Sequence, residues 1–560
     1  MRLKIIIFLS FLLYQTGVYS KTTEKNEFNH KYLSNYFSAL LSYDNQNHND
    51  AIKFFNVSKK FLIKKHDNFL KRYVFSLVLD GQIKKAIDQI KILENSNNSN
   101  FFEAKLLLAL DSMAKKNYKK AAKRLNKLSI FENNEGYDYV IYNTIKDYNN
   151  LFLNKKIQKQ SKNFGKLSLI TNTFQNCYLN SNQTNSHFLN LINSEEGDYS
   201  RYLFFYLSNI INNQEYNMAN EISKTIEPLS SSLLISQSKK WIEEKQFKKF
   251  VNYFSCKNEN HLLAEFFFLI SNLFSSQENF EKSNFYLRLS NYLNPKFYFN
   301  LSLIAENYYL NNNFDLAKKI LEKFNSKDEI YYWYKTKKNA QILAAQKDDD
   351  ASLKYIEKKI KNLKSPSTKI LYDLANIYKN FKKYEKAIEY YSIVLSKLDN
   401  NSSTYADVLY RRGGSFERIG QYDKSDADLL RSLEIIPDDP YTANYLAYSW
   451  LERNFNIVKA IEMLELAYKN KKNDPYITDS IGWGYYIMGD YNTSEKYLKK
   501  ALELMPYDPI IHDHYGDVLW RLNRKIQAKY FWESVLDLED TEEKMKKDIF
   551  FKLLNGLKKI

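Results

Sequence analysis

Glycine and proline are scarce in this chain, whose 560 residues include 13 glycines and 8 prolines. Strand-rich and α/β folds need both residues in number, because tight turns depend on them. Their scarcity therefore excludes a β-rich fold and predicts long helices joined by short polar turns. The chain is also too long for one ordinary core, so it must form several domains or an array whose core grows by stacking.

Cysteine and histidine are also scarce, with two and seven residues respectively. Cys177 and Cys256 leave two interpretations open, a disulfide formed in an oxidising compartment and two incidental buried thiols. We favour the thiols, since two cysteines do not make a scaffold that depends on them. The chain has no phosphate-binding glycine loop, serine elbow or His-Glu-x-x-His motif. We therefore expect no cofactor and no enzymatic activity.

Two clusters of metal-type ligands lack the spacing of a metal site. The His-Asp-His triplet at 512–514 places its histidines two residues apart, and on a helix they point away from each other. Helical zinc pairs need a spacing of three or four. The three aspartates at 348–350 lack the spaced carboxylates and the glycine of a calcium loop, and they fit a solvated turn. We expect no metal.

The N-terminus has the order of a secretory signal. Charged Met1–Lys4 precedes the apolar stretch Ile5–Leu13, and small residues follow up to Ser20. We expect cleavage after Ser20 and a periplasmic or secreted product. The alternative is an uncleaved membrane anchor, although the apolar stretch is shorter than the ~20 residues of a membrane span.

The formal charge of +17 suits acidic partners or an anionic membrane surface. The lysines are scattered along the chain, as on a solvated polar face, and do not form blocks. We therefore expect no nucleic-acid partner, and the secretory signal favours the same conclusion. Peripheral association with an anionic membrane surface stays open.

A 34-residue pattern recurs near the C-terminus. One unit has its small, bulky and helix-ending residues at Gly482, Tyr485, Leu498, Ala501 and Pro506. The same order returns 34 residues later, at Gly516, Leu519, Ala528, Trp532 and Val535. In such helix–turn–helix units a small residue on the first helix allows a close approach of the second.

Weaker copies of the pattern extend upstream. Ser283 and Ala317 are 34 residues apart, whereas Ala51, Ala86 and Ala121 follow each other at 35. The predicted organisation is a signal at 1–20, degenerate repeats at 32–136, an irregular helical region at 137–263, central repeats at 264–367, a C-terminal array at 368–542 and a capping helix at 543–560. The capping helix should begin with a capping box from Asp540 to Glu543. Its buried face is predicted to carry Met545, Ile549, Phe550, Leu553, Leu554 and Leu557.

Three runs carry a family resemblance, "NYLAYSW" from Asn444, "DPYITDSIGWGYY" from Asp474 and "DPIIHDHYGDVLWR" from Asp508. They resemble the tetratricopeptide repeat proteins of proteobacteria, in secreted or membrane-associated chains. The resemblance implies an all-α, right-handed α-solenoid that acts by protein–protein contact. The basic and asparagine clamp with which some members grip a terminal carboxylate is not matched, since Asp479 and Asp513 stand at comparable places.

The first helix of each repeat lines the groove of such a solenoid, so its register gives candidate binding residues. Aromatic and arginine side chains are the types that dominate interface energetics. The candidates for the partner-binding groove are Tyr410, Tyr445, Arg453, Asp479, Trp483, Tyr486, Asp513, Asp517, Trp520 and Arg521. The competing interpretation is that half of them only pack against neighbouring repeats.

The sequence favours an elongated periplasmic solenoid that binds a protein or peptide, as a scaffold or assembly factor of the cell envelope. The alternative is a glycan-binding or glycan-processing protein with its site in the irregular region 137–263. A third class, a structural carrier for envelope polysaccharide export, shares the fold and differs only in its partner.

Overall fold

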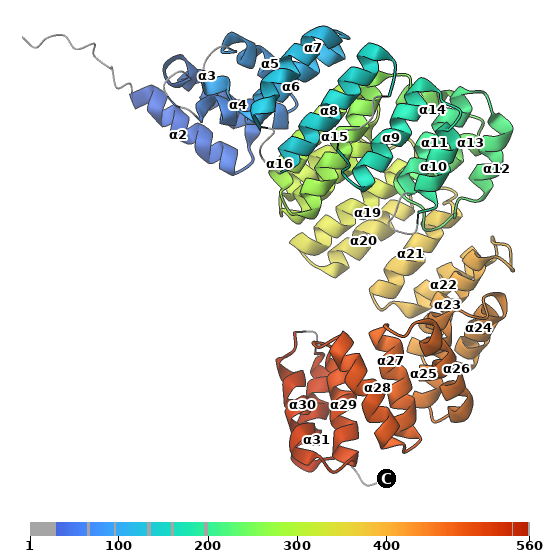
Figure 1. Cartoon of the computed structure of the whole chain (residues 1–560). Coiled ribbons are helices and arrows are strands. Elements are labelled where there is room, and N and C mark those ends of the chain that lie inside the picture. The colour runs from blue at the N-terminus through green and yellow to red at the C-terminus, as the bar shows by residue number, and fades with distance from the viewer. Residues whose placement is uncertain are drawn as a thin grey trace, which may run out of the picture. The chain divides into compact units, whose positions relative to one another are not determined.

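A computed structural model describes residues 30–63, 66, 68–94, 97–131, 136–157, 162–194, 200–539 and 541–557. Within these ranges the chain forms helices and no strand (Figure 1). None of the helices described is long and apolar enough to cross a membrane. The predicted signal at 1–20 and the predicted cap Asp540 lie outside the described residues.

The chain divides into two compact units. The first unit holds the residues up to 224 together with 232–335, and the second holds 225–231 together with the residues from 336 onward. Helix α19 (Glu329–Gln346) runs across the division.

The α-helices of the first unit are α2 (His30–Asp44), α3 (His48–Leu62), α4 (Phe69–Leu79), α5 (Ile83–Ile92), α6 (Phe102–Ala114), α7 (Tyr118–Leu125), α8 (Tyr137–Asn154), α9 (Lys166–Leu179), α10 (Thr184–Ile192), α11 (Ser200–Asn212), α12 (Tyr216–Lys224), α13 (Leu233–Glu243), α14 (Lys248–Tyr253), α15 (Glu259–Ser276), α16 (Phe280–Leu293), α17 (Leu301–Leu310) and α18 (Phe314–Leu321). Short 3-10 helices lie at η1 (Asn97–Ser99), η2 (Asn126–Phe131) and η3 (Tyr298–Asn300).

The α-helices of the second unit after α19 are α20 (Asp349–Ile360), α21 (Thr368–Asn380), α22 (Tyr384–Leu395), α23 (Ser403–Arg418), α24 (Tyr422–Ile435), α25 (Pro440–Glu452), α26 (Ile457–Asn470), α27 (Pro475–Ile487), α28 (Tyr491–Leu504), α29 (Pro509–Arg521), α30 (Lys525–Asp537) and α31 (Glu543–Asn555).

Local sequence explains where the repeat helices begin. Asp439, Asp474 and Asp508 cap α25, α27 and α29, and each accepts a hydrogen bond from a backbone N–H of the first turn. A proline follows each aspartate, at a position whose N–H would have no helical partner. The Asp-Pro pairs therefore fix the starts of three first helices.

Small residues set the spacing within the repeats, as predicted. A Cβ on Gly482 would lie 2.7 Å from Leu498 Cγ, and one on Gly516 would lie 2.5 Å from Trp532 Cδ1. Ala501 and Ala528, on the second helices of the same repeats, are fully buried. The all-α solenoid expected from this pattern is confirmed.

The first unit departs from the elongated array that we expected. Its N-terminal repeats contact its central repeats, with the rings of Phe75 on α4 and Phe285 on α16 4.6 Å apart. The Tyr43 hydroxyl donates a 2.6 Å hydrogen bond to Glu281 Oε1 on α16. Helices whose contacting residues are 210 and 238 positions apart in the chain thus lie side by side, and the elongated description is wrong for this unit.

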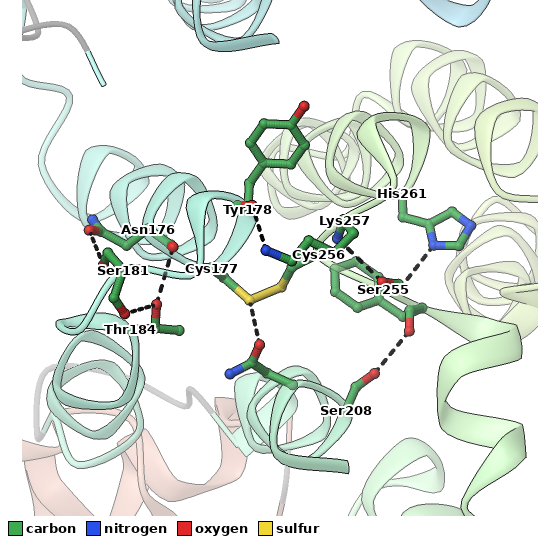
Figure 2. Close-up of a disulfide and its surroundings, with 12 residues drawn as sticks. Asn176, Cys177, Tyr178, Ser181, Thr184, Ser208, Ser255, Cys256, Lys257 and His261 are labelled. Carbon is green, nitrogen blue, oxygen red and sulfur yellow. Dashed lines mark hydrogen bonds between the residues drawn. A yellow bond between two sulfur atoms is a disulfide. The ribbon is translucent and has the colours of Figure 1, made fainter. Parts of the chain in front are cut away.

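The two cysteines form a disulfide, which corrects our preference for incidental thiols. Figure 2 shows Cys177 of α9 joined to Cys256 in the connection between α14 and α15, with the Cα atoms 5.7 Å apart. Beside the disulfide, Lys257 Nζ donates a 3.1 Å hydrogen bond to the carbonyl of Tyr178. The spacing of the cysteines gave no hint of this pairing, because the irregular helices α10–α14 lie between them. The disulfide therefore joins the two ends of the segment that contains α10–α14.

The C-terminal helix α31 packs on the last repeat. Ile549 is fully buried there, and Met545, Leu553 and Leu557 contact the same core cluster. Phe550 and Leu554, which were predicted on the buried face, are exposed by 54% and 84%. Each lies one residue, or about 100°, beyond a contact position, and so on the side of α31 that turns away from the core cluster.

Candidate protein-binding groove

The ten predicted binding residues lie on first helices of the C-terminal repeats, or at the end of one. Tyr410 is on α23 and Tyr445 on α25, whose C-terminal cap is Arg453. The others are on α27 and α29. The structure separates eight of them into three groups. Arg521 links two of these groups and Arg453 lies apart, so the ten residues do not form one surface.

The first group lines a pocket of about 440 Å³ on α21, α23 and α25. The rings of Tyr410 and Tyr445 meet edge to face at 5.7 Å. Tyr445 donates a 3.1 Å hydrogen bond to Glu417 Oε2, and Tyr384 at the start of α22 also lines the pocket. The pocket therefore offers three aromatic rings with polar ends, the type of surface enriched at interfaces.

Four cations surround these tyrosines, and a single carboxylate, Glu542, joins them in the lining. The cations are Lys379, Lys382, Arg411 and Arg418. Outside the lining, Asp407 pairs with Arg411 at 3.0 Å and Glu417 with Arg418 at 3.5 Å.

Of the four cations, Lys379 is the one whose positive charge is not matched by an acid. Among the ion pairs of the described residues, none joins Lys379 to an acid. Burial, and then the nearby Arg411 charge, lower the pKa of Lys379. The four cations of the lining thus exceed Glu542, Asp407 and Glu417 by one positive charge.

The second group surrounds Trp483 on α27. Its indole stacks on the ring of Tyr486 at 4.6 Å and on His514 at 4.1 Å. Its Nε1 donates a 2.8 Å hydrogen bond to Glu452 Oε1 on α25. Asp479 lies beneath this stack, buried, with its carboxylate 2.9 Å from His514 Nδ1. Trp483 of α27 thus contacts the first helices before and after its own, α25 and α29, and contributes to packing as well as to the surface.

The charge of His514 depends on Asp479. Burial alone would lower the pKa of His514, but the Asp479 charge and its hydrogen bond outweigh burial and raise the pKa. When folding raises the pKa of a histidine, its protonated form stabilises the folded state. This stabilisation is complete below the pKa of the unfolded chain, about 6.5, and is lost as the pH rises through the pKa of the folded state.

We therefore expect the second unit to lose local stability as the pH rises above about 6.5, and His514→Gln to reduce this dependence. Glutamine keeps a donor toward Asp479 but does not titrate. Hydrogen exchange of α27 and α29, measured between pH 6 and 9 and corrected for intrinsic rates, checks this. Equal pH dependence in the wild type and the variant would contradict the assignment.

The third group lies under the C-terminal helix. Lys552 of α31 donates to Asp513 at 2.5 Å and to Asp517 at 2.8 Å, and Trp532 Nε1 donates to Asp517 at 3.0 Å. The indole of Trp520 packs beside that of Trp532, with ring centroids 5.3 Å apart. A Cβ on Gly556 would clash with the indole of Trp520, so only glycine fits at that contact. Asp517 is buried here and Trp520 is largely enclosed.

Two candidates have other partners. Arg521 donates a 3.2 Å hydrogen bond to the Tyr486 hydroxyl, which links the second and third groups. Arg453 contacts the second helix of the preceding repeat, where it donates at 2.8 Å to Asp426 Oδ1 on α24. Its guanidinium also lies over the ring of Tyr422 at 4.7 Å. Arg453 thus joins two repeats and stands apart from the pocket.

Our sequence reasoning missed the pocket cations. Arg411 and Arg418 are seven residues apart on α23, with Gly414 between them, and this spacing places all three on one helical face. We treated the basic residues as scattered along solvated faces, so the face was overlooked. In the described part of the chain no group of three His, Cys, Asp or Glu side chains is placed to hold a metal ion.

Comparison with known families agrees with the geometry. Residues 368–394, 406–439 and 480–508 match the family model described as the tetratricopeptide repeat. The chain carries tetratricopeptide repeats. Two of the matched segments include residues of the basic pocket, and the third includes Trp483 and Tyr486. Repeats of this type present extended surfaces to other proteins, which is the general function of an interaction scaffold.

Among curated proteins, the TPR repeat-containing protein PA4667 of Pseudomonas aeruginosa is 31% identical over 111 residues, which is 20% of this chain and 19% of that protein. The match thus spans about a fifth of the length of the relative. Among solved structures, the chain is similar to MamA of Desulfovibrio magneticus RS-1, with 17% identity, 32% of this chain and 99% of that chain covered, and a TM-score of 0.28. TTC0263 of Thermus thermophilus, a thermophilic TPR protein, has 16% identity, coverage of 34% and 100%, and a TM-score of 0.30.

Proposed function

We propose that this chain is a non-enzymatic scaffold or assembly factor of the bacterial cell envelope. In this proposal the pocket on α21, α23 and α25 binds an acidic segment of a partner protein. The observation that carries the proposal is the excess of positive charge beside Tyr384, Tyr410 and Tyr445. Aromatic rings supply contact area at low entropic cost, and complementary charge selects the partner.

The chain itself supports the choice of a carboxylate ligand. Glu542, from the segment before α31, lines the pocket 3.6 Å from Lys382 Nζ. Both side chains of this pair are exposed, so the contact is weak and exchangeable. A partner with several acidic side chains offers more charge than this single carboxylate.

Two features favour the envelope as the location. Residues 1–20 have the order of a secretory signal, and the buried disulfide belongs to the type of bond that persists in oxidising compartments. The periplasm is therefore the proposed location, with removal of the signal. The formal charge of +17 also suits peripheral contact with an anionic membrane surface.

Site-specific photo-crosslinking in the native cell tests the proposal. A photo-reactive phenylalanine at position 410 is expected to give a discrete protein adduct in the periplasmic fraction. Arg418→Glu combined with Lys379→Glu should reduce the adduct at least about tenfold, because a hydrogen bond to a charged group contributes on the order of 1.5–3 kcal/mol and the reversed charges repel an acidic segment. Lys529→Glu, on an exposed position of α30, is the control for the change in charge.

The same photo-reactive residue at Tyr530, which is 67% exposed on α30, controls for random collision. The proposal fails if the adduct survives the reversal of charge at 379 and 418. It also fails if positions 410 and 530 capture the same protein with equal yield, or if the adduct is confined to the cytoplasm.

A further inference from the structure

A second pocket lies in the first unit, far in sequence from the repeats that carry the proposed function. It has a volume of about 370 Å³ and is lined by residues of the α2–α3 turn, the end of α4 and helices α16–α18. Asn313 Nδ2 donates to Gln46 Oε1 across 3.3 Å and joins the two sides. The cavity therefore forms where the N-terminal and central repeats of the first unit, about 240 residues apart in the chain, lie side by side.

Two polar side chains in the lining are buried and each has a nitrogen atom without a hydrogen-bond partner among the described residues. His48 and Arg288 are each 9% exposed. Among the described residues, none accepts from Arg288 Nε, and none forms a hydrogen bond with His48 Nδ1. A buried polar atom without a partner costs about 1–3 kcal/mol, so a ligand that satisfied such an atom would recover that free energy. Here two such atoms belong to residues that line one cavity.

The electrostatics of the cavity favour an anion. Arg288, Lys319 and Lys323 line it, and Asp80 is the one acid in the lining. Asp80 Oδ2 accepts a 2.6 Å hydrogen bond from Gln82 Nε2, and the three cations outnumber this single negative charge. Burial lowers the pKa of His48 to about 4, so its ring is neutral at pH 7 and can donate from Nδ1 without adding charge.

We propose that this cavity binds a small ligand through a carboxylate or phosphate group held by Arg288 and His48, with Lys319 and Lys323 at its solvent-exposed side. Arg288, Lys319 and Lys323 supply the positive charge of the lining, and Arg288 Nε and His48 Nδ1, which are closed to solvent, have no hydrogen-bond partner among the described residues. The volume lies at the small end of ligand pockets and fits a metabolite-sized anion. The site does not depend on the partner groove.

Calorimetric titration of the full mature chain tests the site, with inorganic phosphate and succinate as separate probes at constant ionic strength. We expect saturable binding of at least one probe at a stoichiometry of one. Arg288→Gln should weaken that binding at least about tenfold, the factor that corresponds to the loss of one charged hydrogen bond. Lys84→Ala, which removes an exposed charge on α5 outside the lining, should bind like the wild type.

Because Arg288 is buried, its variant can lose the fold as well as the ligand. The double variant Lys319→Ala/Lys323→Ala changes exposed lining residues, keeps the core intact and should also weaken binding several-fold. Binding of phosphate alone identifies a phosphate site, and binding of succinate alone identifies a carboxylate site. Binding of neither probe, or equal binding by the wild type and the double variant, overturns the proposal.

Discussion

Replacing Ala501 by glutamate is expected to destabilise the second unit by about 3–5 kcal/mol. Ala501 is fully buried on α28, in the repeat where Gly482 meets Leu498. A glutamate there buries an unpaired charge at a contact built for a methyl group. Because the helix pairs of a solenoid contact mainly their neighbours, the loss should centre on α25–α30 and spare the first unit.

Urea unfolding combined with limited proteolysis measures this effect. Lys499→Glu, on the exposed side of the same helix, introduces the same residue and should change stability by less than about 0.5 kcal/mol. New cleavage sites should lie between α25 and α30 in the Ala501 variant alone. If that variant resists protease as the parent does, the repeat register is wrong.

Removing the disulfide is expected to destabilise the first unit by about 2–4 kcal/mol. Cys177 and Cys256 are separated by 79 residues, and a loop of that length has a large entropy in the unfolded chain. The double variant Cys177→Ser/Cys256→Ser should show faster hydrogen exchange in α9–α15. Exchange in α27–α30 should stay unchanged, since those helices belong to the other unit.

Reductant provides the matched control for the disulfide. Unfolding the wild type in dithiothreitol should give the stability of the double serine variant, and dithiothreitol should have no effect on the variant itself. Equal stability of the oxidised wild type and the variant would show that the first unit does not depend on the bond. Cys177 is fully buried, so reduction requires at least partial unfolding.

The sequence predicted the repeats well because packing within each repeat is local. A small residue at Gly482 or Gly516 and a bulky one at Leu498 or Trp532 lie within one helix pair, so their spacing is visible in the chain. The starts of α25, α27 and α29 at Asp-Pro are local in the same way.

Contacts between distant segments were not predictable by the same reasoning. The pairing of Cys177 with Cys256 and the contact of Phe75 with Phe285 depend on how irregular helices fold back. The cavity around Arg288 forms only when these segments fold back on each other, so no single stretch of the sequence predicts it.

The candidate groove was predictable only in part. Register placed Trp483 and Tyr410 on first helices correctly, but it does not tell whether a side chain faces a partner or a neighbouring repeat. Asp479 and Asp517 are buried against His514 and Lys552, and these pairings depend on contacts between repeats and with α31. Whether the ten residues bind a partner stays a prediction.

The chemistry of the segment captured at position 410 tests the central claim most directly. Mass spectrometry of the peptide joined to the photo-reactive residue identifies the partner and the part of it that enters the pocket. The basic residues around Tyr410 and Tyr445 predict a segment of another protein rich in aspartate and glutamate. A basic or uncharged segment, or an adduct that contains no protein, would contradict the account.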